Sequence, residues 1–298
     1  MDLSGILVMN KPQGFTSFDV IGKLRGILRM RRLGHTGTLD PMAEGVLPVL
    51  VGTAAKACDL LPDETKVYRA GFRLGTVTDT QDSTGTVLET HPAAVSEHEL
   101  LRVLPQFSGD IQQIPPMYSA VQINGKRLYE LARAGKEIER QARTVHVEQL
   151  DLLEYDADNG TGTIRIVCGK GTYVRTILHD IGQALHCGAV MTSLQRTAAC
   201  GFTLAQAYGF AEVQQAADEN RIAGLLIPTD SLFTVYPALH LPERESVLYR
   251  NGVKLRLDQL KNLQSDAAAF RVYGSDGSFF GLAYPDAASE CLRILKNL

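Results

Sequence analysis

The chain has 298 residues, a formal net charge of −3 and a hydrophobic content of 45%. This hydrophobic content excludes a disordered chain, and the length predicts two domains or one large domain with a small appendage. Because the overall charge is slightly acidic, any nucleic-acid partner requires a local basic surface.

The pattern of single residue types argues against several classes of protein. The cysteines number five, and no pair has CxxC spacing, so neither a disulfide framework nor a common zinc motif is expected. The N-terminus lacks the basic region of a signal peptide, and no apolar run has membrane-spanning length. We therefore expect a cytoplasmic protein without a metal site or a membrane segment.

The N-terminal region predicts a short strand at 6–8 and then a helix. A capping box opens the segment 16–28, in which apolar residues recur at helical spacing. The basic residues Arg29, Arg31 and Arg32 follow, with no acidic residue among them. Such a run can be a solvated helix face. Because all its charges are positive and it lies beside the segment 34–45, a phosphate-binding edge is favoured.

The segment 34–45 places one carboxylate, Asp40, between glycine-rich turns. A carboxylate in so constrained a turn can be a cap, a metal ligand, a base or a nucleophile. A metal site would need more ligands beside Asp40, and His35 is the only nearby candidate. A catalytic pair of Asp40 and Glu44 would need a regular helix, which Pro41 and Gly45 disfavour. A nucleophile would need a cation to keep it ionised, for which Arg175 is a candidate. On composition alone, a simple turn cap is favoured.

The middle of the chain alternates between predicted strands and helices. Alternating hydrophobicity predicts strands at 66–74, 86–88, 145–155 and 162–167. Helical spacing predicts helices at 96–104, 127–135 and 169–185. Asn124-Gly125 predicts a hairpin turn, and it lies in a segment, 122–146, that carries an excess of basic residues.

The C-terminal part differs in character from the rest. From about residue 234 onward, short apolar segments alternate with glycine-marked turns, and strands are expected at 254–257, 267–272 and 279–283. A stretch of about 65 residues of this kind predicts a small β-barrel.

Seven short motifs follow one another along the chain at 10–17, 34–41, 66–68, 74–82, 115–120, 125–129 and 169–175. Together they resemble the TruB family of bacterial tRNA pseudouridine synthases. The resemblance implies an α+β catalytic domain at 1–230, with a large mixed, mostly antiparallel sheet flanked by helices. It also implies an RNA-binding insertion at about 122–146 and a PUA-like β-barrel at 234–298.

The resemblance assigns roles to individual residues. Asp40 occupies the position of the catalytic aspartate, and Arg175 that of the arginine that pairs with it. Tyr68 matches a tyrosine that packs against the target base and has been proposed as a proton acceptor, and His35 matches a histidine that contacts the rearranged RNA loop. No role is assigned to the segment 194–196. Further RNA contacts are expected from Lys11, Arg29, Arg31, Arg32, Lys126, Arg127 and Tyr173.

The implied reaction is the isomerisation of uridine 55 in the T-loop of tRNA. The uridine is flipped out, its N1–C1′ bond breaks, and the base rotates and rejoins through C5. Asp40 would form a transient adduct at C6 of the base or at C1′ of the ribose. No cofactor, guide RNA or obligate protein partner is implied. Two alternatives remain, namely a guide-RNA-dependent relative within a multiprotein particle and an RNA-binding folding factor.

Overall fold

The computed structural model of the chain describes residues 3–123, 125–260 and 267–298. Its α-helices are α1 (Ser17–Leu28), α2 (Glu97–Val103), α3 (Leu128–Arg133), α4 (Val174–Ala184), α5 (Phe210–Asp218) and α6 (Glu243–Arg250). Short 3-10 helices are η1 (Gly52–Ala57), η2 (Leu104–Phe107), η3 (Leu204–Gln206), η4 (Ile222–Leu225), η5 (Thr229–Phe233) and η6 (Leu257–Gln259). Within the described residues, no helix is long and apolar enough to cross a membrane.

The strands form two larger sheets and two hairpins. The main sheet contains β1 (Gly5–Lys11), β2 (Leu33–His35), β3 (Glu44–Val51), β4 (Lys66–Leu74), β7 (Gly109–Gln113), β10 (Arg143–Asp156), β11 (Thr161–Cys168), β12 (Ala189–Ala199) and β13 (Phe202–Thr203). The hairpins pair β5 (Thr76–Thr78) with β6 (Val87–Thr90) and β8 (Gln122–Ile123) with β9 (Lys126–Arg127). The C-terminal sheet contains β14 (Ala238–His240), β15 (Leu255–Arg256), β16 (Phe270–Tyr273), β17 (Phe279–Asp286) and β18 (Cys291–Asn297).

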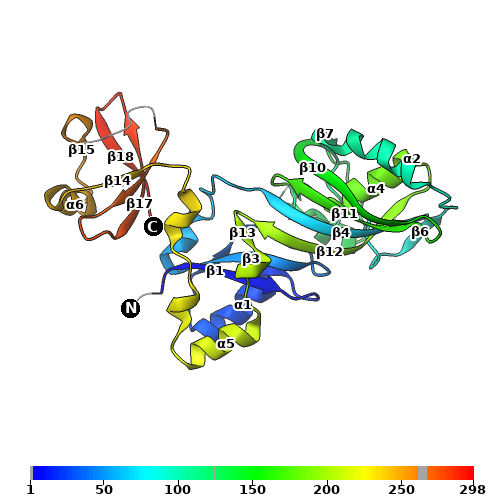
Figure 1. The fold of residues 1–298 in the computed structure, drawn as a ribbon, viewed down its shortest axis with the longest axis horizontal. Helices are drawn as coiled ribbons and strands as arrows, with labels where there is room; N and C mark the ends of the chain where they lie inside the picture. Colours follow the sequence, from blue (N-terminus) through cyan, green and yellow to red (C-terminus); the bar gives the residue numbers. More distant parts are fainter. Residues whose placement is uncertain (1–2, 124, 261–266) are drawn as a thin grey trace.

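The main sheet is mixed and mostly antiparallel, as the family resemblance implies. Its strand order is β1-β3-β12-β4-β11-β10-β7, and the pairing between β3 and β12 is parallel. This parallel junction consists of two residue pairs, Glu44 with Gln195 and Gly45 with Arg196. The sheet therefore has two halves, one around β1 and β3 and one around β4, β11 and β10, which meet at this short junction (Figure 1).

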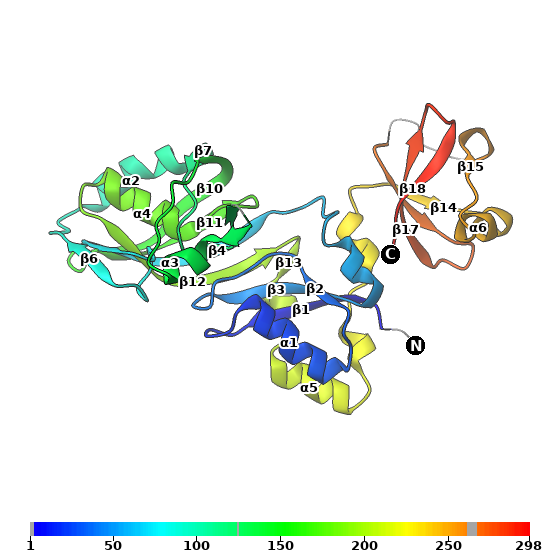
Figure 2. The same ribbon diagram turned by 180° about the vertical axis from the view of Figure 1, so that it is seen from behind.

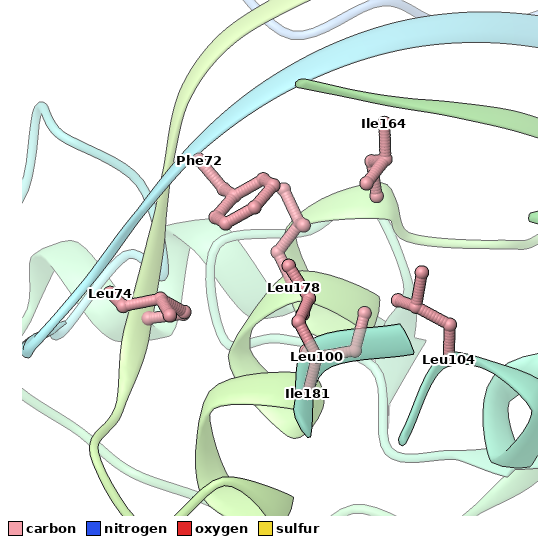
Figure 3. A pocket seen from close by; sticks show the side chains of 8 residues that line it. Phe72, Leu74, Leu100, Leu104, Ile164, Leu178 and Ile181 are labelled. Carbon is pink, nitrogen blue, oxygen red and sulfur yellow. The ribbon is translucent and has the colours of Figure 1, made fainter. Parts of the chain in front are cut away.

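Each half of the sheet has its own helical cover. Along β4, Tyr68 and Phe72 face a core that they share with α4, whereas Arg69 and Arg73 are exposed, so the predicted alternation is confirmed. Helices α1 and α5 pack together beside β1 and β3 (Figure 1). Figure 3 shows apolar side chains from β4, α2, η2, β11 and α4 meeting in the core that contains Tyr68 and Phe72, where they offer no polar group to a ligand.

Strand β12 and helix α6 were not predicted from the sequence. Bulges at Met191/Ser193 and Arg196/Ala198 interrupt β12, so its residues do not alternate regularly between buried and exposed. Helix α6 is short and strongly polar, which hides its helical period among the strands and turns expected in this region. The predicted hairpin at 124–125 is flanked by the paired strands β8 and β9, although Asn124 itself lies outside the described residues.

The C-terminal sheet forms a separate body that contacts the main sheet through one apolar cluster. Figures 1 and 2 show it at one end of an elongated molecule. Leu282 of β17 shares a core cluster with Phe233, which ends η5, and with Ile6 of β1. At the edge of this contact, Lys296 Nζ lies 3.2 Å from an Asp59 carboxylate oxygen. The C-terminal body is therefore docked on the N-terminal half of the main sheet.

We predict that Gly45→Ala destabilises the sheet junction. Gly45 has a φ of 107°, and a Cβ atom there would lie 2.3 Å from the backbone oxygen of Arg196. Because that neighbour is backbone and cannot swing away, we expect the free energy of unfolding in urea to fall by at least about 1 kcal/mol.

The matched control is Gly26→Ala in the last turn of α1, where nothing lies within 4 Å of the added Cβ. Its free energy of unfolding should stay the same or rise by up to about 1 kcal/mol, because alanine favours a helix over glycine. Equal stabilities of the two variants would contradict the tight approach of β3 and β12.

Candidate active site

The loop between β2 and β3 carries Asp40 and is anchored to the start of α1. The backbone N–H of Leu39 donates to Ser17 Oγ over 2.8 Å, and the N–H of Gly14 donates to the carbonyl of Pro41 over 2.7 Å. These contacts hold the residues on both sides of Asp40, whereas its own side chain remains 35% exposed. The carboxylate is thus fixed by its backbone and open to a substrate.

Arg175 faces this carboxylate from the first turn of α4. Its Nε lies 2.9 Å from Asp40 Oδ2, and its side chain is only 4% exposed. The two remaining nitrogens donate to the carbonyls of Thr80, over 2.9 Å, and Tyr118, over 3.0 Å. Since every nitrogen of the guanidinium has an acceptor, its orientation toward Asp40 is strongly constrained.

A second carboxylate, Asp82, lies behind Arg175 and is almost fully buried. Its Oδ2 is 3.8 Å from an Arg175 nitrogen. Its Oδ1 accepts from the Thr80 hydroxyl over 2.8 Å and from the Thr84 hydroxyl over 2.6 Å. Asp82 thus accepts from hydroxyls of its own turn and supplies negative charge on the buried side of the guanidinium.

Tyr68 lies in the centre of the sheet beside the same loop. It is 6% exposed and belongs to the core cluster that contains Leu39. Burial raises the pKa of Tyr68, whereas the neighbouring Arg196 guanidinium acts in the opposite direction. Its phenol is therefore neutral at neutral pH, and the ring forms an apolar wall near Asp40.

Arg196 is a second buried arginine, and it holds the loop by its backbone. The side chain is fully buried, and Nε donates to the carbonyl of Val46 over 2.7 Å. The other two nitrogens donate to the carbonyls of Gly37, over 3.2 Å, and Thr38, over 3.5 Å. Arg196 is also the cross-strand partner of Tyr68. One side chain thus connects the Asp40 loop, β3 and the strand that carries Tyr68.

The sequence assigned no role to Arg196 because nothing local marks it as buried. It lies beside a bulge in a strand with irregular polarity, where an arginine would normally be exposed. Its acceptors come from residues about 150 positions earlier in the chain. Only the assembled sheet brings them within reach.

Lys11 requires a correction, since the sequence predicts an RNA contact for it. Its side chain is fully buried beneath the Asp40 loop. The ammonium group donates to the carbonyls of Phe15, over 2.6 Å, and Pro12, over 3.0 Å, and it lies 3.5 Å from that of Pro41. Burial lowers the pKa of Lys11 to about 8, although the charge of Asp40 opposes this shift. Lys11 therefore supports the loop and does not present its charge to solvent.

Two further predicted residues, Tyr173 and His35, are partly buried in the described structure. The backbone N–H and carbonyl of Tyr173 are both bound by the buried Gln113 amide, over 2.8 and 3.1 Å. This clamp, which the sequence did not reveal, fixes the residue that precedes α4. His35 ends β2 and is half-buried, and its pKa is lowered by burial and by the Arg196 charge. Its imidazole is therefore neutral at neutral pH.

The remaining predicted contacts lie on the surface. Arg29, Arg31 and Arg32 follow α1, and Lys126 and Arg127 form β9, and all five side chains are exposed. None of them makes an ion pair with another described residue. These two groups of positive charge are therefore available to an anionic partner.

No group of three or more His, Cys, Asp or Glu side chains in the described part of the chain could hold a metal ion. The arrangement instead offers one accessible carboxylate, a fixed guanidinium and an aromatic wall. Such a set can carry nucleophilic catalysis by the carboxylate.

Comparison with known families agrees with this geometry. Residues 25–174 match the model of the TruB family pseudouridylate synthase N-terminal domain, and residues 175–234 match that of the tRNA pseudouridylate synthase B C-terminal domain. The tRNA pseudouridine synthase B of Lachnoclostridium phytofermentans is 43% identical over 304 residues, covering 99% of both chains. That of Stutzerimonas stutzeri is 40% identical and covers 94% of this chain and 91% of its own.

Solved structures show the same fold at lower sequence identity. A crystal structure of a Cbf5–Nop10–Gar1 complex matches with a TM-score of 0.72 at 22% identity, covering 98% of this chain and 84% of that chain. A structure of an H/ACA RNP bound to a substrate RNA containing 2′-deoxyuridine matches with a TM-score of 0.73 at 20% identity and the same coverage. The mixed sheet and its helices are therefore those of a pseudouridine synthase fold.

We predict that Arg196→Met lowers the stability of the fold. The methionine would fill much of the space but would leave the carbonyls of Val46, Gly37 and Thr38 without their donor. We expect the free energy of unfolding in urea to fall by about 2 kcal/mol or more.

The control is Arg69→Met on the neighbouring strand β4. Arg69 is 51% exposed and pairs with Glu154 at 3.0 Å, so its loss should change the free energy of unfolding by less than about 1 kcal/mol. If Arg196→Met were as stable as Arg69→Met, the buried guanidinium would not hold the loop.

Proposed function

The chain belongs to the TruB family of pseudouridylate synthases, and on this basis we propose that it converts uridine 55 in the T-loop of tRNA to pseudouridine. The observation that carries the proposal is the partly exposed Asp40 carboxylate, held 2.9 Å from the buried Arg175 guanidinium. The relatives named tRNA pseudouridine synthase B support tRNA as the substrate.

In this proposal, Asp40 is the nucleophile. The target uridine is stacked within a folded RNA loop, so it must be flipped out before its glycosidic bond can be reached. Asp40 then forms an adduct at C6 of the base or C1′ of the ribose, the N1–C1′ bond breaks, and the rotated base rejoins through C5. Loss of the proton from C5, uptake of a proton at N1 and release of the carboxylate complete the isomerisation.

Arg175 and Tyr68 support this chemistry in different ways. The guanidinium stabilises the negative charge of Asp40 and fixes its direction, which is the condition for a reproducible attack. The ring of Tyr68 provides the apolar surface against which a flipped base can pack. As the proposed acceptor of the C5 proton, the neutral phenol would have to pass on its own proton, which burial makes more costly and the Arg196 charge beside it makes less costly.

The proposed RNA interface uses local positive charge in an acidic chain. One group of positive charge, Arg29, Arg31 and Arg32, precedes the Asp40 loop in the sequence. The other, Lys126 and Arg127, belongs to the proposed insertion at 122–146. We assign Tyr173 and His35 to contacts with the RNA close to the target nucleotide. Residues 1–230 would form the catalytic domain, and 234–298 a PUA-like RNA-binding domain, for which the five-stranded C-terminal sheet is compatible support.

A guide-RNA-dependent enzyme is the alternative that the fold itself suggests, because the matched Cbf5 chain was solved with Nop10 and Gar1. That likeness rests on 22% identity and concerns the fold. The stand-alone assignment is supported by identities of 40% and 43% to the enzymes of the tRNA pseudouridine synthase B type, across nearly the whole chain. An RNA-folding role without catalysis is disfavoured by the assembled Asp40–Arg175 pair.

We predict that Asp40→Asn abolishes pseudouridine formation on a bare T-arm stem-loop with the isolated protein. The amide is nearly isosteric but is not a nucleophile, so the single-turnover rate should fall by at least roughly a thousandfold, while the RNA Kd stays within about threefold.

Glu44→Gln serves as the control, because Glu44 is an exposed carboxylate only four residues away that contacts Gln195. It should retain the wild-type rate. Unchanged turnover in Asp40→Asn would remove Asp40 from the mechanism, and wild-type activity that appeared only with guide RNA and partner proteins would overturn the stand-alone assignment.

We also predict a steep salt dependence of tRNA binding, which the triple variant Arg29→Gln, Arg31→Gln, Arg32→Gln should reduce. Each lost phosphate contact lowers the slope of log K against log salt by about 0.7 to 0.9, so a decrease of about 2 is expected. Arg102→Gln on α2, another exposed arginine, should leave the slope unchanged. A flat salt titration of the wild-type protein would exclude binding dominated by phosphate contacts.

A further inference from the structure

Phe18, in the first turn of α1, is an exposed aromatic side chain without a structural function. It is 67% exposed, and it is the only aromatic residue among the exposed large hydrophobic side chains of the described residues. Single exposed apolar residues are ordinary on protein surfaces, so exposure alone assigns no role. Its position and its neighbours distinguish it.

The backbone of Phe18 is fixed relative to the Asp40 loop. The preceding residue, Ser17, is buried and bonds through Oγ to the N–H of Leu39, over 2.8 Å. A complete capping box between Thr16 and Asp19 holds the same helical turn. Because Ser17 and Leu39 are the sequence neighbours of Phe18 and Asp40, the Cα atoms of Phe18 and Asp40 lie no more than about 14 Å apart. The backbone at Phe18 is therefore held within about 14 Å of that of the candidate nucleophile.

The surroundings of the ring combine open space with positive charge. Gly22, one turn further along α1, has no side chain, and the space at its Cβ position is open. The guanidinium carbon of Arg25 lies 5.7 Å from the ring centroid. The nearby acid, Asp19, is engaged by the backbone and hydroxyl of Thr16. An aromatic face beside an exposed arginine suits a nucleobase with its phosphate.

We propose that Phe18 is a stacking platform for an unpaired base that flanks the target uridine, with Arg25 contacting the adjoining phosphate. This inference rests on the proposed function, since it presumes an RNA loop at Asp40. Bases in RNA loops are held by stacking on aromatic side chains and by contacts with arginine. A protein partner would instead require a contiguous apolar patch, whereas the neighbours of Phe18 on α1 are a glycine, an acid and an arginine.

The first test compares Phe18→Leu with Phe18→Tyr in binding and turnover of a T-arm stem-loop. Leucine keeps an apolar side chain but lacks a π-face, so we expect its RNA Kd and KM to rise about tenfold, with kcat at saturating RNA unchanged. Tyrosine keeps the ring and should bind within about twofold of wild type. Unfolding of both variants should match wild type, because the side chain is exposed. RNA binding by Phe18→Leu equal to wild type would overturn the proposal.

The second test uses the absence of tryptophan from the chain. Phe18→Trp introduces a single indole, whose emission should be quenched by T-arm RNA if a base stacks on it. The control is Leu88→Trp on β6, where the native side chain is 61% exposed and lies far from α1 (Figure 2). Equal emission changes in both variants would contradict stacking at Phe18.

The proposed function and the stacking role of Phe18 can be tested separately. A wild-type protein that forms no pseudouridine on the T-arm would overturn the proposed function. A wild-type protein that forms it, together with a Phe18→Leu variant of unchanged RNA affinity, would overturn the platform alone and would direct attention to a protein partner for Phe18.

Discussion

The buried Arg196 guanidinium is the contact on which the geometry of the site depends. The two halves of the main sheet meet where β3 and β12 run parallel, and this junction consists of two residue pairs. Arg196 extends the junction through its side chain, which donates to carbonyls of β3 and of the loop that carries Asp40. Its own strand neighbour is Tyr68, so the same residue sets the spacing between the loop and the aromatic wall.

The two buried arginines serve the site in opposite ways. Arg175 lies between the carboxylates of Asp40 and Asp82 and directs the side chain of Asp40. Arg196 contacts backbone carbonyls and directs the path of the loop. Lys11 adds a third buried cation beneath the same loop. Burying three cations is costly, and the hydrogen bonds that each makes to protein oxygens offset that cost.

The division between buried and exposed positive charge explains how an acidic chain can approach RNA. The buried cations are used internally and stabilise the loop, whereas Arg29, Arg31, Arg32, Lys126 and Arg127 are exposed and have no carboxylate partner among the described residues. A net charge of −3 therefore says little about the surface near the site. Local potential decides which partner can approach it.

The sequence by itself determined the local elements and the candidate nucleophile. Helices α1 and α4 and strand β4 follow from capping signals and from short-range periodicity, which depend on residues close together in the chain. The constrained turn singled out Asp40, but its role as nucleophile and its pairing with Arg175 followed from the family resemblance of the motifs. Tertiary structure alone decided the burial of Lys11 and Arg196 and the Gln113 clamp on Tyr173. The contacts of Gln113 and Arg196 join residues 60 to about 150 positions apart, and the contact of Lys11 with Pro41 spans 30 positions, so no local pattern encodes them.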